Sequence, residues 1–145
     1  MATMAIPKHI RLEFVTPERA LAKDDVDEVQ LPGLDGFFGV LPGHAPLLAA
    51  LQPGEMWFRK GAVKEFAFVG GGFAEVVGDR VSILAPVAEK AEDIDLARAE
   101  AAKRRAEERL AAPKSDMDFE RARIALIRAI SRLDAAKRAQ VRSRS

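Results

Sequence analysis

The chain has 145 residues, of which 48% are hydrophobic and 31% are charged, and its formal net charge at pH 7 is +1. It is long enough for one ordinary domain, no apolar run approaches the roughly 20 residues that a membrane-spanning helix needs, and the absence of Cys excludes disulfides, thiol nucleophiles and thiolate metal sites. The charge is segregated, because residues 119–145 carry 8 basic and 2 acidic side chains against 15 and 20 in residues 1–118, a block that suits an acidic partner, an anionic ligand or a solvated face.

Residues 8–88 divide into short apolar segments separated by Pro and Gly, which is typical of an all-β sandwich or barrel. In the first segment, HIRLEFV, the residues Ile10, Leu12 and Phe14 alternate with polar residues, as in a half-buried strand. Similar segments follow at VDEVQL, GFFGVL, PLLAAL, EMWFRK, KEFAFV, FAEVV and RVSILA. We therefore expect about nine strands, with turns at Pro32-Gly33, Pro42-Gly43, Pro53-Gly54, Gly61, the glycines 70–72 and Gly78-Asp79.

The stretch GLDGFFGVLPGHAPLLAALQPG, residues 33–54, is rich in Gly and contains His44, a composition that could also indicate chemistry. It contains neither of the Gly-rich phosphate-binding signatures, and no Cys or suitable Ser accompanies His44. His9 is the only other histidine, so a histidine metal site would have to be completed by carboxylates. We interpret the stretch as turn architecture; a hydrolase using His44 stays open as an alternative.

After Pro86 the hydrophobic period changes to that of helices. A first helix is expected over residues 93–112, and the segment PKSDMD separates it from a second, for which Ser115 or Asp116 is the N-cap. The apolar stripe of the first helix is Leu96, Ala99, Ala102, Ala106 and Leu110, and that of the second is Phe119, Ala122, Leu126, Ala129, Ile130 and Leu133. So short a connection predicts an antiparallel two-helix hairpin, in residues 89–145, after a β-sandwich domain in residues 1–88. Its alanine-rich stripe buries little apolar area, so we expect the hairpin to gain order from the sandwich, a ligand or another subunit.

Four arginines form a pattern on the two helices. Arg98 and Arg105 are seven residues apart on the first, and Arg128 and Arg132 are four apart on the second, so each pair shares a helix face. If the hairpin brings the pairs together, an anion such as a triphosphate suits their charge and fork geometry. The alternative is a solvated, salt-bridged face. A nucleic-acid-binding protein with the basic tail RLDAAKRAQVRSRS is a further alternative, although the β half is acidic and lacks an RNA-binding aromatic signature.

Several of these segments together resemble the epsilon subunits of bacterial F-type ATP synthases, called delta in mitochondria. They are LPGLDGFFGVLPGHAPLLAALQPG, FVGGGFAEV, VSILA, DIDLARAEAAKRRAEERL and DFERARIALIRAISRL, which run in order from about Ile10 to about Leu133. The resemblance implies a sandwich of about ten strands followed by the two-helix hairpin. It also implies a non-catalytic central-stalk subunit with no metal and no required cofactor. The sandwich would contact the gamma subunit and the rotor ring of c subunits, and the helices would inhibit hydrolysis in the alpha/beta catalytic head. The subunit would lie, peripherally, at the cytoplasmic face of the bacterial inner membrane, with no nucleic acid as partner.

The resemblance also implies a regulatory ATP site. Some members of the family bind ATP on the folded hairpin through an Ile/Leu-Asp-x-x-Arg-Ala motif, which here supplies Ile94, Asp95, Arg98 and Ala99. The other binding positions of the family fall on Glu89, Arg105, Arg128 and Arg132, so the resemblance selects the same four arginines as the helix pattern. One departure is Phe37, where some relatives carry an acidic residue that faces the rotor ring.

Overall fold

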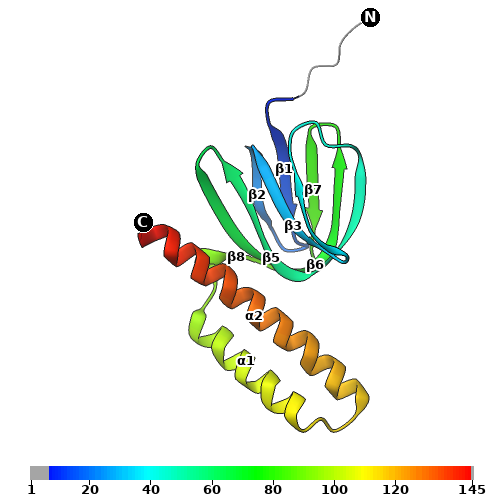
Figure 1. Ribbon diagram of the computed structural model, residues 1–145, viewed down its shortest axis with the longest axis vertical. Helices are drawn as coiled ribbons and strands as arrows, with labels where there is room; N and C mark the ends of the chain where they lie inside the picture. Colours follow the sequence, from blue (N-terminus) through cyan, green and yellow to red (C-terminus); the bar gives the residue numbers. More distant parts are fainter. Residues whose placement is uncertain (1–6, 145) are drawn as a thin grey trace, which may run out of the picture.

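A computed structural model describes the backbone of residues 7–144 and the side chains of residues 7–141, and it contains a β-sandwich followed by a two-helix hairpin (Figure 1). The predicted fold class is therefore confirmed. The strands are β1 (Ile10–Val15), β2 (Ala20–Val26), β3 (Glu28–Gly33), β4 (Gly36–Val40), β5 (Leu47–Lys60), β6 (Val63–Val77), β7 (Arg80–Leu84) and β8 (Ala88–Lys90). They pair in the order β2-β1-β7-β6-β5-β3-β4, with β8 added beside β6. Among the strands that the structure describes, only β1 and β7 pair in parallel.

The described strands number eight rather than nine or ten, because two of the predicted turns lie inside strands. β5 runs through Pro53-Gly54 and β6 runs through the glycines 70–72, and the two strands stay paired from Leu47–Val76 to Lys60–Val63. Glycine lets β6 bend there without leaving the ladder, since Gly71 and Gly72 have φ values of 90° and 109°. β2 and β8, by contrast, were not expected. The bent pair β5–β6 contributes to both layers of the sandwich. In one layer β7 pairs with the C-terminal half of β6, and in the other β3 pairs with β5 and β8 pairs with the N-terminal half of β6.

The core of the sandwich lies between the layers. The predicted inward residues of β1, Ile10, Leu12 and Phe14, are all buried. At Gly72 the neighbouring strands β6 and β7 come so close that an added Cβ atom would lie 2.1 Å from the carbonyl oxygen of Leu84. The backbone of β6 can therefore approach β7 here only without a side chain.

The helical part begins with a 3₁₀ turn, η1 (Ala91–Asp93), and continues as α1 (Leu96–Ala111) and α2 (Asp116–Arg144). The two helices lie side by side and antiparallel (Figure 1), as predicted, and the C-terminal half of α2 also packs on β5 and β6. The predicted cap Ser115 is confirmed, since its hydroxyl accepts the backbone N–H of Asp118 at 3.0 Å. Within residues 7–144, neither helix is long and apolar enough to span a bilayer.

The predicted stripe of α2 is correct in its centre and wrong at its margin. Ala122, Ala129 and Leu133 are buried, whereas Phe119 and Ile130 are exposed. At about 100° per residue, the two exposed residues lie some 60–80° around the helix from Ala122, beyond the narrow contact with α1. The division of the chain at residue 88 stays a prediction; β8 spans it, so Glu89 belongs to a strand.

Candidate functional site

The described residues form a pocket of about 460 Å³ between the start of α1, the middle of α2 and β8. Asp95 caps α1, because its carboxylate accepts the backbone N–H of Arg98 at 3.1 Å. The lining residues are Glu89, Asp93, Ile94, Asp95, Arg98, Ala99, Ala102, Arg105 and Arg132. The pocket thus joins the positive end of the α1 dipole to arginines of both helices and to a carboxylate of the sandwich.

Arg132 is held in this pocket from two sides. Its Nε donates to Oε1 of Glu89 at 2.7 Å, and its guanidinium carbon lies 4.4 Å from the centre of the Phe68 ring. The negative face of an aromatic ring attracts such a cation. A guanidinium has five N–H donors, so these contacts orient Arg132 and leave donors for an anion.

Seven of the eight residues predicted for a nucleotide site line this pocket, from both of its helices and from β8. The eighth, Arg128, is exposed on α2 one turn before Arg132 and does not line it. The helix pattern therefore brings together three arginines, Arg98, Arg105 and Arg132, rather than four.

The structure adds three residues that were not assigned to the site. Asp93 directly precedes the motif and Ala102 belongs to the predicted stripe of α1, so adjacency and period could have suggested both. Phe68 could not be found in this way. It lies 21 residues before Glu89 and becomes its neighbour only through the pairing of β6 with β8.

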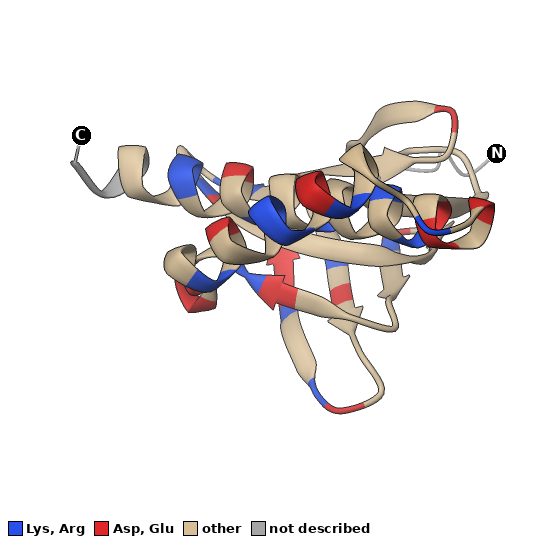
Figure 2. Ribbon diagram, turned by 90° about the horizontal axis from the view of Figure 1, so that it is seen from below, with Lys and Arg blue, Asp and Glu red and all other residues tan. Residues whose placement is uncertain are grey.

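The charges of the pocket are more balanced than the arginine pattern suggested. Three carboxylates, those of Glu89, Asp93 and Asp95, line it together with the three arginines, and both signs recur along the hairpin (Figure 2). Arg98 and Arg105 nevertheless form no ion pair within residues 7–141. Two guanidinium groups of the pocket are thus available to an anion, although the three carboxylates reduce the net positive charge that would attract it.

A second feature is an apolar face on the outside of the sandwich. Ala50, Phe73, Leu84 and Val15 stand opposite one another in a row across β5, β6, β7 and β1, so their side chains share one face. Phe73 and Leu84 are more than half exposed. An apolar notch of about 330 Å³, lined by Val15, Thr16, Pro17, Leu84, Ala85 and Pro86, continues the row. A contiguous exposed apolar surface of this kind indicates a docking face for another protein.

The turn between β3 and β4 extends this apolar surface. Leu34 donates its N–H to the carbonyl of Ala50 at 3.1 Å, which places the turn beside the row. Phe37 is 61% exposed, and Leu34 is similarly exposed. His44 follows in the connection to β5, where its Nδ1 lies 2.6 Å from the carbonyl oxygen of Ala45 and its backbone N–H bonds to Leu41. Its contacts are those of a turn residue, in agreement with the interpretation of this stretch as architecture.

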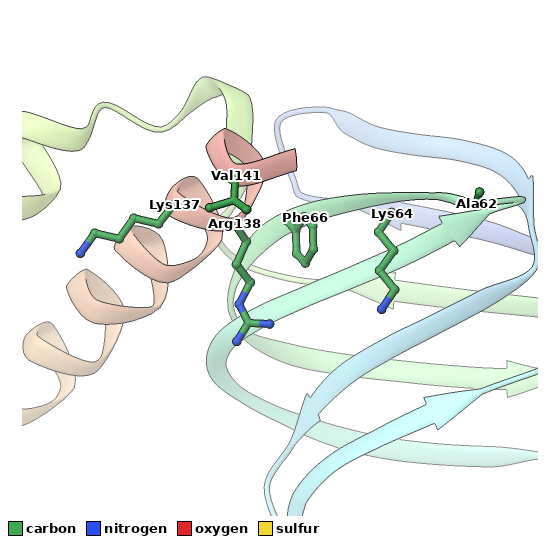
Figure 3. Close-up of a pocket in the computed structure, with 6 residues that line it drawn as sticks. All are labelled: Ala62, Lys64, Phe66, Lys137, Arg138 and Val141. Carbon is green, nitrogen blue, oxygen red and sulfur yellow. The ribbon is translucent and has the colours of Figure 1, made fainter. Parts of the chain in front are cut away.

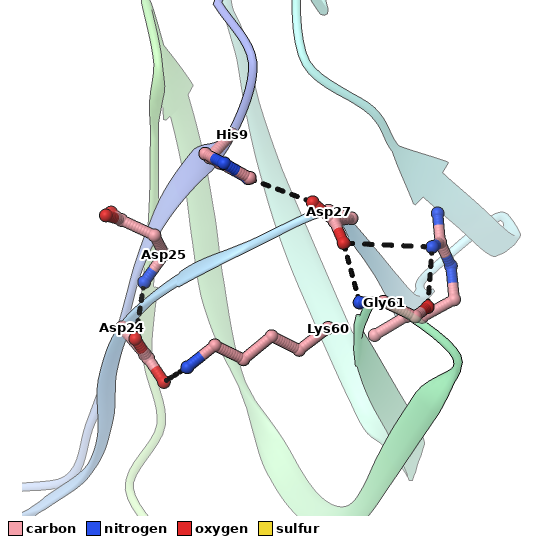
Figure 4. A network of polar contacts seen from close by, with 7 residues as sticks. His9, Asp24, Asp25, Asp27, Lys60 and Gly61 are labelled. Atoms are coloured by element: carbon pink, nitrogen blue, oxygen red, sulfur yellow. Dashed lines mark hydrogen bonds and ion pairs between the residues drawn. The ribbon is translucent and has the colours of Figure 1, made fainter.

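The other histidine belongs to a polar network that ties the start of β1 to two strand connections (Figure 4). Nδ1 of His9 lies 2.9 Å from Oδ1 of Asp27, and Oδ2 of Asp27 accepts the N–H of Gly61 at 2.7 Å. The Gly61 hydrogen bond, and then that of His9, lower the pKa of Asp27. A hydrogen bond of 2.6 Å from Lys60 lowers the pKa of Asp24 in the same way. These exposed hydrogen bonds join neighbouring strand connections, so the network has a structural role at the surface.

Both halves of the chain match models of one protein family. Residues 9–91 match the beta-sandwich domain of the ATP synthase delta/epsilon chain, and residues 92–137 match its long alpha-helix domain.

Individual relatives agree with these models. The chain is 49% identical to the ATP synthase epsilon chain of Syntrophobacter fumaroxidans over 129 residues, which cover 89% of this chain and 96% of the relative. It is also 49% identical to that of Nitratidesulfovibrio vulgaris over 107 residues, 74% of this chain and 80% of the relative.

Two solved structures have a similar fold. A chain of the Euglena gracilis mitochondrial ATP synthase superposes with a TM-score of 0.82 and 26% identity, over 93% of this chain and 85% of that one. A chain of the Tetrahymena thermophila enzyme superposes with a TM-score of 0.57 and 16% identity, over 94% and 98%, which is evidence for the fold alone.

Proposed function

The chain belongs to the delta/epsilon family of ATP synthase subunits and is a central-stalk subunit of that enzyme, and we propose that its sandwich transmits rotation while its helical hairpin regulates ATP hydrolysis. Its partners are the gamma subunit, the rotor ring of c subunits and the alpha/beta head. We propose no catalytic site for the chain itself. The family membership favours this function over a hydrolase built on His44 and over nucleic-acid binding.

The observation that carries the rotor function is the exposed apolar face of the sandwich. The row Ala50, Phe73, Leu84 and Val15 offers gamma an apolar surface with a notch beside it, and buried aromatic and aliphatic anchors dominate such interfaces. We assign the neighbouring β3–β4 turn, with Phe37 at the start of β4, to the rotor ring. An apolar contact would there replace the acidic contact of some relatives.

The test is assembly. When the tagged chain is expressed in its native organism and purified, gamma, the ring and the alpha/beta head should co-purify with it. The isolated chain should not hydrolyse ATP. Recovery of nucleic acid instead, with binding that falls steeply as salt rises, would contradict the proposal.

We also assign the pocket between the helices to a regulatory ATP. Arg98, Arg105 and Arg132 would bind the phosphates, and Glu89 and Asp95 would accept hydrogen bonds from the ribose or the adenine amine. The support is convergence, since the family motif and the pocket select seven of the same residues. ATP that contacts both helices stabilises the docked hairpin by RT ln(1 + [L]/Kd), about 2.7 kcal/mol at a hundredfold excess over Kd.

Calorimetry on the isolated chain tests this site. Arg105→Ala removes charge-assisted hydrogen bonds worth roughly 1.5–3 kcal/mol, so we expect ATP to bind about ten- to a hundredfold more weakly. Arg123→Ala is the matched control, because Arg123 is exposed and paired with Glu120 on its own helix. Arg128→Ala should weaken binding less than Arg105→Ala. The absence of binding at millimolar ATP, or equal weakening by Arg105→Ala and Arg123→Ala, would reject the site.

The remaining part of the proposal concerns place and regulation. As a peripheral subunit the chain would lie at the cytoplasmic face of the bacterial inner membrane, held there through gamma and the ring. The hairpin would inhibit hydrolysis when it leaves the sandwich and extends into the alpha/beta head. ATP bound to the docked hairpin would oppose this when ATP is plentiful.

A further inference from the structure

Three residues form a row across the strands on which α2 docks. Phe68 of β6 stands opposite Glu55 of β5 and opposite Glu89 of β8, so the three side chains share one face. Phe68 is fully buried beneath the hairpin. Oε1 of Glu55 lies 3.2 Å from Nε of Arg138, and Oε1 of Glu89 lies 2.7 Å from Nε of Arg132. Two ion pairs, one on each side of Phe68, therefore connect α2 to the sandwich.

The two carboxylates differ in how completely they are satisfied. The side chain of Glu55 is only 12% exposed, and its Oε2 is buried with no hydrogen-bond partner within the described residues. Glu89 is more open, at 32%. A buried charge is costly unless it is fully paired and hydrogen-bonded. Glu55 is thus the weaker of the two connections when it is ionised.

The partner of Glu55 compensates its charge only in part. Arg138 is 61% exposed, and it borders an open groove of about 480 Å³ between the C-terminal end of α2 and the β5–β6 hairpin (Figure 3). Phe66 and Val141 lie beside Arg138 in this groove. Water that reaches the guanidinium from the groove screens its attraction for the carboxylate. The burial of Glu55 is therefore not offset by an equally buried counter-charge.

We propose that Glu55 makes docking of the hairpin proton-sensitive: the protonated side chain favours α2 docked on the sandwich, and the ionised carboxylate favours its release. The use of this device in controlling hydrolysis rests on the proposed function of the hairpin. The docking chemistry itself does not.

The direction follows from the environment of Glu55. Burial raises the pKa of Glu55 above its usual range; Arg138 acts against this, and Asp134, also on α2, adds to it. The residue opposite on β6, Phe68, is uncharged. With α2 released, Glu55 would face water and keep an ordinary pKa near 4.3. The docked state then binds the proton more tightly, so docking is strongest below about pH 4.3 and weakens as the pH rises through the raised pKa. The docking constant falls about tenfold for each pH unit that separates the docked pKa from the released one.

Two measurements on the full chain test this device. The carboxyl carbon resonance of Glu55, followed by NMR, should titrate at higher pH than an unperturbed glutamate, whose pKa is about 4.3. Docking can be followed by the distance between spin labels, because the chain has no Cys of its own. Lys23→Cys on β2 and Lys114→Cys between the helices place the labels at exposed sites. The docked fraction should fall as the pH rises from about 4.5 to about 8.

Variants separate Glu55 from other titrating groups. Glu55→Gln imitates the protonated side chain and should keep the hairpin docked across this range. Glu75→Gln, at an exposed glutamate on β6, is the matched control and should keep the wild-type pH profile. Arg138→Gln should move the Glu55 titration to still higher pH. The proposal is overturned if Glu55 titrates in the ordinary range of a glutamate, if docking does not weaken with rising pH, or if Glu55→Gln keeps the wild-type profile. None of these measurements uses gamma, ATP or hydrolysis, so failure of the proposed function and failure of this device are distinguishable.

Discussion

Truncation of Phe73 should weaken binding to gamma without weakening the fold. Phe73 is 57% exposed at the centre of the apolar row. With about 200 Å² for a Phe side chain, roughly 110 Å² of it is free to be covered by a partner. At about 25 cal/mol per Å², full coverage is worth about 2.8 kcal/mol, or close to a hundredfold in the dissociation constant. Phe73→Ala should lose up to that factor in binding to purified gamma, measured by surface plasmon resonance.

Two controls make the Phe73 measurement specific. Val63→Ala removes a comparably exposed apolar side chain at the β5–β6 hairpin, outside the row, and should leave gamma binding unchanged. The thermal midpoint of Phe73→Ala should stay within a few degrees of the wild type, because an exposed side chain contributes little to the core. If Phe73→Ala binds gamma as tightly as the wild type, gamma docks elsewhere on the sandwich.

Three further changes have defined outcomes. Gly72→Ala should destabilise the sandwich by more than about 3 kcal/mol in urea unfolding, because the new Cβ would lie 2.1 Å from a backbone oxygen and the φ of this residue is 109°. Gly39 has open space around it, so the control Gly39→Ala should change the free energy of unfolding by less than about 1 kcal/mol. The lowered pKa of Asp27 stabilises the fold above its unfolded pKa of about 3.9, and this stabilisation is lost as the pH falls through the lower folded value. The thermal midpoint of the wild type should therefore fall more steeply between about pH 5 and pH 2.5 than that of Asp27→Asn; parallel curves would remove the network from the account of acid stability. A chain that ends at Lys90 keeps every described strand of the sandwich, so it should retain β-type circular dichroism and gamma binding. ATP synthase assembled with this shortened chain should hydrolyse ATP at least as fast as with the intact chain. Slower hydrolysis would contradict an inhibitory hairpin.

The amino-acid sequence by itself determined the class of the fold, and it selected four residues at the start of α1 that line the pocket. The alternation of apolar and polar residues in β1 and the three- to four-residue hydrophobic period after Pro86 are local properties of the chain. They indicate which face of each strand or helix is buried. The motif at Ile94, Asp95, Arg98 and Ala99 occupies one helix start, so its residues are close in space wherever that helix lies.

The tertiary structure decided what depends on pairing between distant segments. Local turn propensity predicted breaks at Pro53-Gly54 and the glycines 70–72, but the cross-strand ladder of β5 and β6 continues through both, because the bend that closes the sandwich needs these residues. The exclusion of Arg128 from the pocket and the contact of Arg132 with Phe68 follow from how α2 turns as it docks on the sheet. The same docking buries Glu55, and no pattern in the sequence indicated this. The strand pairing that aligns Glu55 with Phe68 joins residues 13 positions apart, and the helix that covers Glu55 lies some 80 residues further along the chain.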